Sequence, residues 1–328
     1  MKFPALSISW EKAGNFPFNN IMKTLLTYIL FSIVIFAGCE KPGPIELVDT
    51  STPSQSISID TTGTGQQSLI TSNPSVDSSG LFGATGGKAF GLMLVAGAHF
   101  DDVNEHHDAS LAQLIFFDPL QPIIHNNDTV SYRLVNVGEV RINGLLLARV
   151  PQHFTISGIS FFDTVIGLQY SLFSKDGIGG RGFQFNSNSQ YVFRNLNTPG
   201  FPIFAETVFT PAMIRVISPQ AGDVIDPSKN LRFQLQGNAN EVSIIIRKRP
   251  LGNASIEQEK PLLRLKAKKK DDEIVIPSSL LRSLPRQTEK YIFSFQVDVT
   301  RKKRMVGFLS DVYLTGSYVH HLMLKIKQ

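Results

Sequence analysis

Cysteine and tryptophan are nearly absent from this chain of 328 residues, which has one of each, Cys39 and Trp10. A single cysteine excludes an intrachain disulfide and a metal site built from several thiolates. A continuous apolar run of about 20 residues, the length that a membrane-spanning helix needs, is also lacking. The fold must therefore be stabilised by its core alone, and the chain is long enough for two domains.

The lone cysteine ends a short apolar segment. The basic start Met22-Lys23 leads into the apolar run Leu25–Ala37, and Gly38 then precedes Cys39. A basic start, a short apolar run and small residues before a cleavage point are typical of a secretory signal peptide. The residues Phe36-Ala37-Gly38-Cys39 resemble the lipobox of bacterial lipoproteins, which implies cleavage before Cys39 and acylation of this cysteine. An uncleaved N-terminal membrane anchor is the alternative.

The first 84 residues are therefore excluded from the predicted folded part. Residues 1–38 form the predicted signal peptide, in which residues 1–21 are an extension before the true start at Met22, or a long leading region that is made and then removed. Residues 39–84 form the lipidated Cys39 and a flexible linker rich in Ser, Thr, Gly, Gln and Pro. Such a segment buries too little apolar surface to offset its ordering entropy, so it would act as a tether.

Residues 85–210 predict a first β domain. The apolar runs Leu92–Ala96 and Leu111–Phe117 are bounded by turn-forming residues, as buried strands are. Asn143-Gly144 between two apolar segments is the strongest hairpin signal, because both residues accept the positive φ angles of a type I′ turn. No stretch of helical period exceeds about two turns.

Residues 211–328 predict a second β domain. Leu231–Leu235 and Tyr291–Val299 alternate between apolar and polar residues, as half-buried strands do, and Ser278–Pro285 is compatible with one short helical turn. Short strands at this spacing favour a sandwich. The predicted fold class is all-β, with two β-sandwich-like domains after the signal peptide and linker.

Three segments of the second domain carry a family resemblance, namely Ile217–Ile225, Ile274–Pro285 and Tyr291–Phe295. They resemble the immunoglobulin-like and fibronectin type III modules of bacterial surface lipoproteins, although the cysteine–tryptophan core of antibody domains is absent. The resemblance implies a module used as a spacer or a binding platform. Residues 85–210 resemble no family.

Charge is unevenly divided between the two segments. Residues 85–210 carry 7 basic and 10 acidic side chains, a net charge of −3, whereas residues 211–328 carry 21 and 11, a net charge of +10. Two basic clusters could form an anion-binding patch or could be solvated hairpin tips. The candidate residues are Lys266, Lys268, Lys269, Lys270, Arg301, Lys302, Lys303 and Arg304. We expect no nucleic-acid partner, because the chain is exported and has no recognised nucleic-acid module.

One short segment concentrates imidazole and carboxylate groups, which suit zinc and other divalent ions. The candidate metal ligands are His99, Asp101, Asp102, His106, His107 and Asp108. Their spacing matches no metal motif, and His107 stands where a calcium loop needs glycine. The alternative is a polar loop between two buried strands. His320-His321 lies in a predicted late strand, where one side chain would be buried and the other exposed.

These observations predict a non-catalytic, cofactor-free protein anchored by lipid at Cys39 in the envelope of a Gram-negative-type bacterium, in the outer membrane. It would bind an unknown protein or polysaccharide partner, or act as a spacer in a surface assembly. A glycan-binding accessory lipoprotein of a nutrient-uptake system is the first alternative. A metal-dependent hydrolase, which depends only on residues 99–108, is the second.

Overall fold

The computed structural model describes residues 57–59, 89–125, 127–155, 163–175, 178–179, 182–196, 200–249, 261–285, 290–305 and 311–327. The chain divides into two compact units, Met1–Thr52 and Pro53–Gln328, and all described residues belong to the second unit. The predicted signal peptide, Cys39 and most of the predicted linker lie outside the described residues. Within the described part, no helix combines the length and apolar character needed to cross a membrane.

The described residues are mostly strands, which confirms the predicted all-β class. The largest sheet has 12 strands, nine of which follow one another across it. In spatial order these are β1 (Ile57–Ile59), β16 (Leu263–Lys268), β15 (Glu241–Lys248), β18 (Lys290–Arg304), β19 (Asp311–Ile326), β2 (Ala89–Asp101), β3 (His106–His125), β8 (Asp163–Lys175) and β7 (Ala148–Thr155). Three further strands pair beside this path: β13 (Val224–Ile225) with β19, β4 (Asp128–Leu134) with β3, and β9 (Ile178–Gly179) with β8.

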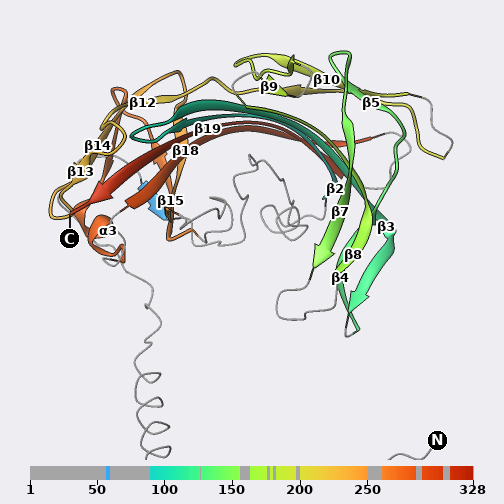
Figure 1. The fold of residues 1–328 in the computed structure, drawn as a ribbon, viewed down its shortest axis with the longest axis horizontal. Helices are drawn as coiled ribbons and strands as arrows, with labels where there is room; N and C mark the ends of the chain where they lie inside the picture. Colours follow the sequence, from blue (N-terminus) through green and yellow to red (C-terminus); the bar gives the residue numbers. More distant parts are fainter. Residues whose placement is uncertain are drawn as a thin grey trace, which may run out of the picture. The chain divides into compact units, whose positions relative to one another are not determined.

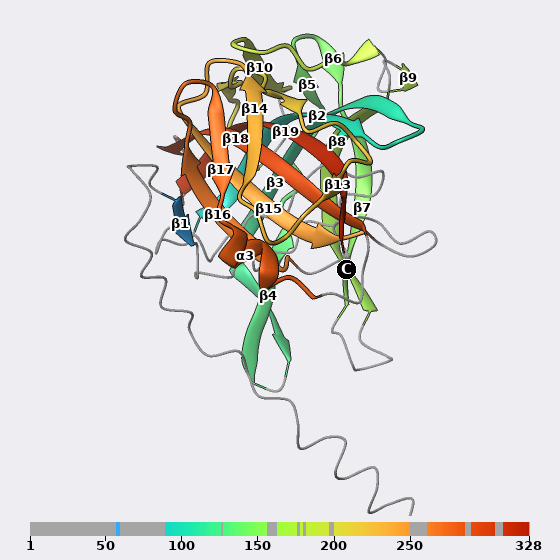
Figure 2. The same cartoon turned by 90° about the vertical axis from the view of Figure 1, so that its left-hand side faces the viewer.

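Two smaller sheets accompany the large one. One has four strands, in the order β11 (Ala205–Phe209), β10 (Gln190–Asn195), β5 (Val140–Ile142) and β6 (Leu145–Leu146). The other has three, in the order β12 (Arg215–Ser218), β14 (Leu231–Gln236) and β17 (Glu273–Ile276), and the short helix α3 (Ser278–Arg282) follows it. Figure 1 shows β5 and β10 over the long strands, and Figure 2 shows β14 and β17 in front of β15 and β18.

The two predicted β segments share the large sheet. β19, at the C-terminal end of the described chain, pairs in parallel with β2, from Asp311 opposite Ala89 to Leu322 opposite Asp101. These strands run side by side with β3 and β18 as long curved ribbons (Figure 1). Most of β19 is buried, which fits its long, mostly apolar sequence, because strands covered on both faces need not alternate. The sequence predicts two separate sandwiches, whereas the structure joins both segments through one sheet.

Each half nevertheless has a two-layer core. The three-stranded sheet packs its apolar side chains, such as Phe233 and Ile274, against Phe293 and Leu322 of the large sheet. The four-stranded sheet packs Phe193 in a second core with Met93 of β2 and Leu314 of β19. Leu314 and Leu322 are an even number of residues apart in β19, so both small sheets cover the same face of the shared sheet.

Phe185 connects the two cores. It packs against both clusters, and its ring centroid lies 5.5 Å from that of Tyr318. The space for this ring exists because Gly97 of β2 has no side chain, since a Cβ atom there would overlap the Phe185 ring. Gly316 of β19 has a similar role, because a Cβ atom on it would overlap the backbone at Phe209 and Thr210.

Local sequence signals identified several elements correctly. Asn143 and Gly144 connect β5 to β6 with φ angles of 45° and 86°, the positive values that the hairpin prediction requires. β14 alternates between buried and exposed residues, as predicted for Leu231–Leu235, and Ser278–Arg282 forms the predicted short helix. One prediction is wrong in part, because Ile57–Ile59 within the expected linker forms β1 on the edge of β16. The β-branched pattern Ile-Ser-Ile favours such pairing.

Candidate functional site

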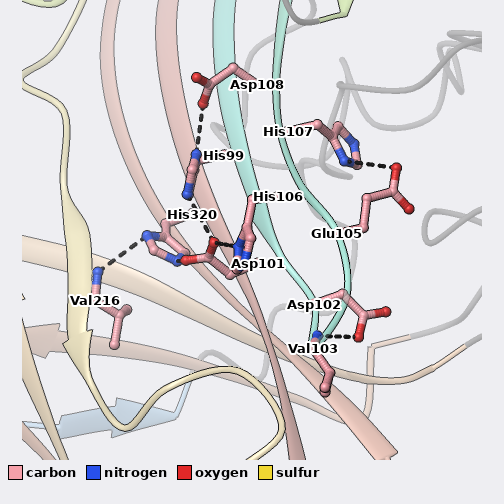
Figure 3. Close-up of polar contacts among 10 residues, drawn as sticks. All are labelled: His99, Asp101, Asp102, Val103, Glu105, His106, His107, Asp108, Val216 and His320. Atoms are coloured by element: carbon pink, nitrogen blue, oxygen red, sulfur yellow. Dashed lines mark hydrogen bonds and ion pairs between the residues drawn. The ribbon is translucent and has the colours of Figure 1, made fainter.

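The candidate metal residues lie at the end of the β2–β3 hairpin. His99 and Asp101 end β2, while His106, His107 and Asp108 begin β3. The turn between the strands is closed by the N–H of Asp102, which donates to the carbonyl of Glu105 at 2.9 Å. The parallel pairing of β19 with β2 places His320 opposite His99, so a third strand contributes to the site (Figure 3).

Asp101 is the centre of a cluster of imidazoles. Its Oδ1 atom lies 2.6 Å from His106 Nδ1 and 3.0 Å from His99 Nε2, and its Oδ2 atom lies 2.9 Å from His320 Nε2. The His320 contact is close, but it does not meet the geometry of a hydrogen bond. Burial alone would raise the pKa of Asp101, but the hydrogen bond from His106 and the nearby imidazoles outweigh it and hold the pKa below its usual value.

His99 bridges two carboxylates. Its Nε2 atom faces Asp101, and its Nδ1 atom lies 2.7 Å from Asp108 Oδ1 on the neighbouring strand. The His320 ring lies edge-on to the His99 ring, with 5.1 Å between their centroids. Side chains of β2, β3 and β19 are therefore tied together on one face of the shared sheet (Figure 3).

The surroundings of His320 define its tautomer. The backbone N–H of Val216 in β12 donates to His320 Nδ1 at 3.2 Å, so the proton of the neutral ring is on Nε2. The side chain is 1% exposed. Burial lowers the pKa of His320 to about 4, since the attraction of Asp101 offsets only part of this cost and His99 and Arg215 add repulsion. His320 is therefore neutral at physiological pH.

The opposite face of the same strands carries a stack of rings. Phe100 lies between His107 and His321, with centroid distances of 4.5 and 4.4 Å. His321 Nδ1 lies 2.8 Å from the hydroxyl of Ser294, and both residues are buried. Burial, and then the charge of Arg247, lower the pKa of His321 well below its usual value. This serine–histidine pair is a core contact, because a substrate has no access to a fully buried hydroxyl.

The six candidate metal ligands therefore do not form one group: they lie on two faces of the shared sheet and contact different partners. Asp102 is not part of the cluster around Asp101, because its Oδ2 atom pairs with a guanidinium nitrogen of Arg249 at 2.9 Å. His107 lies on the Phe100 face, 3.4 Å from Glu105. Among the described residues, no group of three or more His, Cys, Asp or Glu side chains is placed to hold a metal ion. The structure therefore does not support the predicted metal site.

Sequence reasoning missed the role of His320, which is far from the hairpin in the chain. The His320-His321 pair was noticed, but the expectation of one exposed ring is wrong, because they are 1% and 2% exposed. Only the parallel register of β19 on β2 brings His320 to Asp101. The alternation of a strand could have separated the two rings by face, but it could not have identified the neighbouring strand.

The candidate anion patch is divided as well. Lys266 and Lys268 belong to β16, followed by Lys269 and Lys270, whereas Arg301–Arg304 ends β18, and β15 separates these strands. Several of the cations already contact groups of this chain. Lys269 lies 2.6 Å from Asp272, Lys302 lies 2.8 Å from Asp311, and Lys303 lies 2.8 Å from Glu206. Arg301 lies over the Phe209 ring, 4.2 Å from its centroid.

Comparison with known proteins gives no family. No family model matches the chain, and no curated protein matches it. Among solved structures, it is similar to DIP-gamma Ig1+Ig2, with 8% identity, 72% of this chain and 95% of that chain covered, and a TM-score of 0.15. It is also similar to the yeast delta-COP-I mu-homology domain, with 7% identity, 73% and 96% coverage, and a TM-score of 0.21. Similarities with TM-scores this low indicate neither the fold nor the function of this chain.

Proposed function

We propose that this chain is a non-catalytic protein of the bacterial cell envelope, anchored by lipid at Cys39 and acting as a spacer or binding platform in a surface assembly. The signal-peptide pattern and the resemblance to a lipobox support the anchor. The observation that carries the platform role is the shared sheet, in which β19 pairs with β2 over twelve residue pairs. One sheet that carries two cores holds the loops and edges around it on a common support.

The polar chemistry of the hairpin supports a structural role for these groups. The oxygens of Asp101 face three imidazoles of this chain, and His99 contacts a second carboxylate. The contact between Ser294 and His321 is buried. These groups hold strands together, and the sites for partners would lie in exposed loops and strand edges.

The test is incorporation of labelled palmitate in cells that express the wild type or Cys39→Ala, combined with protease treatment of intact cells. We expect label on the wild type and none on Cys39→Ala, with loss of the protein on protease treatment. Absence of label on the wild type would refute the lipid anchor. Label together with full protection from protease would refute the surface location and place the protein on a periplasmic face.

A further inference from the structure

His320 connects two sheets through one hydrogen bond. Val216 belongs to β12, an edge strand of the three-stranded sheet, and its N–H donates to Nδ1 of His320 in the shared sheet. An edge strand has backbone groups without a strand partner, and a side chain from another sheet can satisfy one of them. Behind this bond, Nε2 of His320 faces Asp101 at 2.9 Å, which places the ring between β12 and the β2–β3 hairpin (Figure 3).

The chain that follows β12 also contacts this hairpin. Gly222 lies so close to Val103, in the turn after β2, that a Cβ atom on Gly222 would overlap the Val103 side chain. β12 therefore contacts His320 of the shared sheet through the Val216 hydrogen bond, and the segment after β12 contacts the turn of the β2–β3 hairpin through Gly222 and Val103. A change in the charge of His320 would be transmitted directly to β12.

We propose that His320 is a proton-sensitive latch that holds β12 against β19 when its ring is neutral and releases β12 when the ring is protonated. A neutral ring accepts the Val216 N–H with the lone pair of Nδ1. A proton from solvent that binds Nδ1 uses this lone pair, and two N–H donors then face each other across the same contact. Val216 loses its acceptor, and a positive charge is left in a buried site.

The charged groups around His320 determine the direction of the switch. β2 contributes His99 and Asp101, and β12 contributes Arg215; of these, only Asp101 favours the charged ring. From β3, His106 and Asp108 contact these β2 residues. On β19 itself, His321 lies on the other face, and its own pKa is lowered mainly by burial and to a smaller extent by Arg247 and His320. Burial, together with His99 and Arg215, outweighs the one carboxylate.

The sign of the pH dependence follows from the lowered pKa. The folded protein binds the proton of His320 with a pKa of about 4, against 6.5 for the unperturbed side chain. Between these values the released state binds more protons than the docked state, so docking weakens as the pH falls. The latch is fully closed above about pH 6.5 and is lost as the pH falls toward about 4.

Hydrogen exchange at the Val216 amide tests the latch directly, because this amide is the donor of the proposed bond. We would measure it in the full chain from about pH 7 to about pH 4, corrected for the intrinsic pH dependence of exchange. In the wild type we expect protection at Val216 to fall by about tenfold or more, the factor that one hydrogen bond provides. Constant protection over this range would overturn the proposal.

Two variants distinguish the effect of His320 from that of its neighbour His321. In His320→Asn, the amide oxygen stands near the position of Nδ1 and accepts without titrating, so we expect the protection at Val216 to become independent of pH. In the matched control His321→Asn, which alters the opposite face, we expect the wild-type pH dependence to persist. Loss of the pH dependence in His321→Asn, or its persistence in His320→Asn, would overturn the proposal.

Nitrogen NMR of the wild type keeps the test decisive if His320→Asn fails to fold. We expect the spectrum near pH 7 to show His320 as the neutral tautomer that carries its proton on Nε2, and the signal to change toward the charged form only near pH 4. A ring that is charged at pH 7, or that carries its proton on Nδ1, would overturn the proposal.

Discussion

The carboxylate of Asp101 holds three imidazoles from three strands around it. It lies 18% exposed at the end of β2, and imidazoles from the same strand, from β3 and from β19 surround it. The proximity of His99, Asp101 and His106 was predictable, because a hairpin folds residues so close in sequence onto one another. The contribution of His320 was not predictable, because it depends on a long-range strand pairing.

We expect Asp101→Asn to destabilise the protein by about 1–3 kcal/mol, the cost of removing a charged hydrogen-bond partner from a partly buried group. The side chain keeps its size, but His106 and His99 lose the charge that they contact. Denaturant unfolding of the full chain at neutral pH measures the change.

Asp102→Asn is the matched control for this substitution. Its carboxylate pairs with Arg249 near the surface, with 32% and 41% of the two side chains exposed, so its loss should cost at most about 1 kcal/mol. Equal effects of the two substitutions would show that Asp101 has no special role in joining the strands.

β19 is the element that sequence patterns described least well. Local alternation was sufficient for β14, and the Asn-Gly signal was sufficient for the β5–β6 hairpin, because both depend on neighbouring residues. β19 is mostly buried along its length. Its sequence therefore predicts a strand, but the lack of alternation does not indicate which side chains point to which face of the sheet. Its partner β2 lies at the other end of the described chain, and no local signal specifies that pairing.

Gly316 makes the packing of β19 testable. A Cβ atom there would overlap the backbone at Phe209 and Thr210, which cannot move as a flexible side chain can. We therefore expect Gly316→Ala to destabilise the full chain by about 1–3 kcal/mol, as overpacking does. Thermal or denaturant unfolding measures the change.

The control for Gly316→Ala is Val299→Ala at the opposed position in β18. Val299 is 37% exposed, so trimming it should change the free energy of unfolding by less than about 1 kcal/mol. A stable Gly316→Ala protein would mean that the end of β11, at Phe209 and Thr210, does not approach β19 as the structure places it.

At the scale of the described part of the chain, the strands form one all-β unit that joins two cores through a shared sheet. The sequence supports a division near residue 210, because charge and strand pattern change there. The structure instead gives β2 a partner from the last part of the chain and places Leu314 of β19 in the core that contains Met93. Composition can distinguish two segments of the chain, but it does not reveal that strands of both segments pair in one sheet and share a core.

Expression of residues 85–210 without the rest of the chain tests this arrangement. The fragment would lack β19, which leaves one edge of β2 unpaired and removes Leu314 and Val312 from the core. We expect it to be unfolded or aggregated by circular dichroism and size-exclusion chromatography, since an unpaired long strand edge promotes association.

Co-expression with residues 211–328 should recover a soluble complex of the two pieces. A fragment 85–210 that folds alone as a monomer would contradict the shared sheet and would restore the two independent domains that the sequence predicts.

The pairing of β2 with β19 also has a consequence for the order of events during folding. β2 begins at Ala89 and its partner β19 begins at Asp311, so this pairing cannot form until the residues between them and β19 itself have been synthesised. Contacts so distant in sequence make folding slow, because a large loop must close before they form. For a protein that we propose is exported, late closure leaves time for an unfolded chain to cross the inner membrane before its sheet is complete.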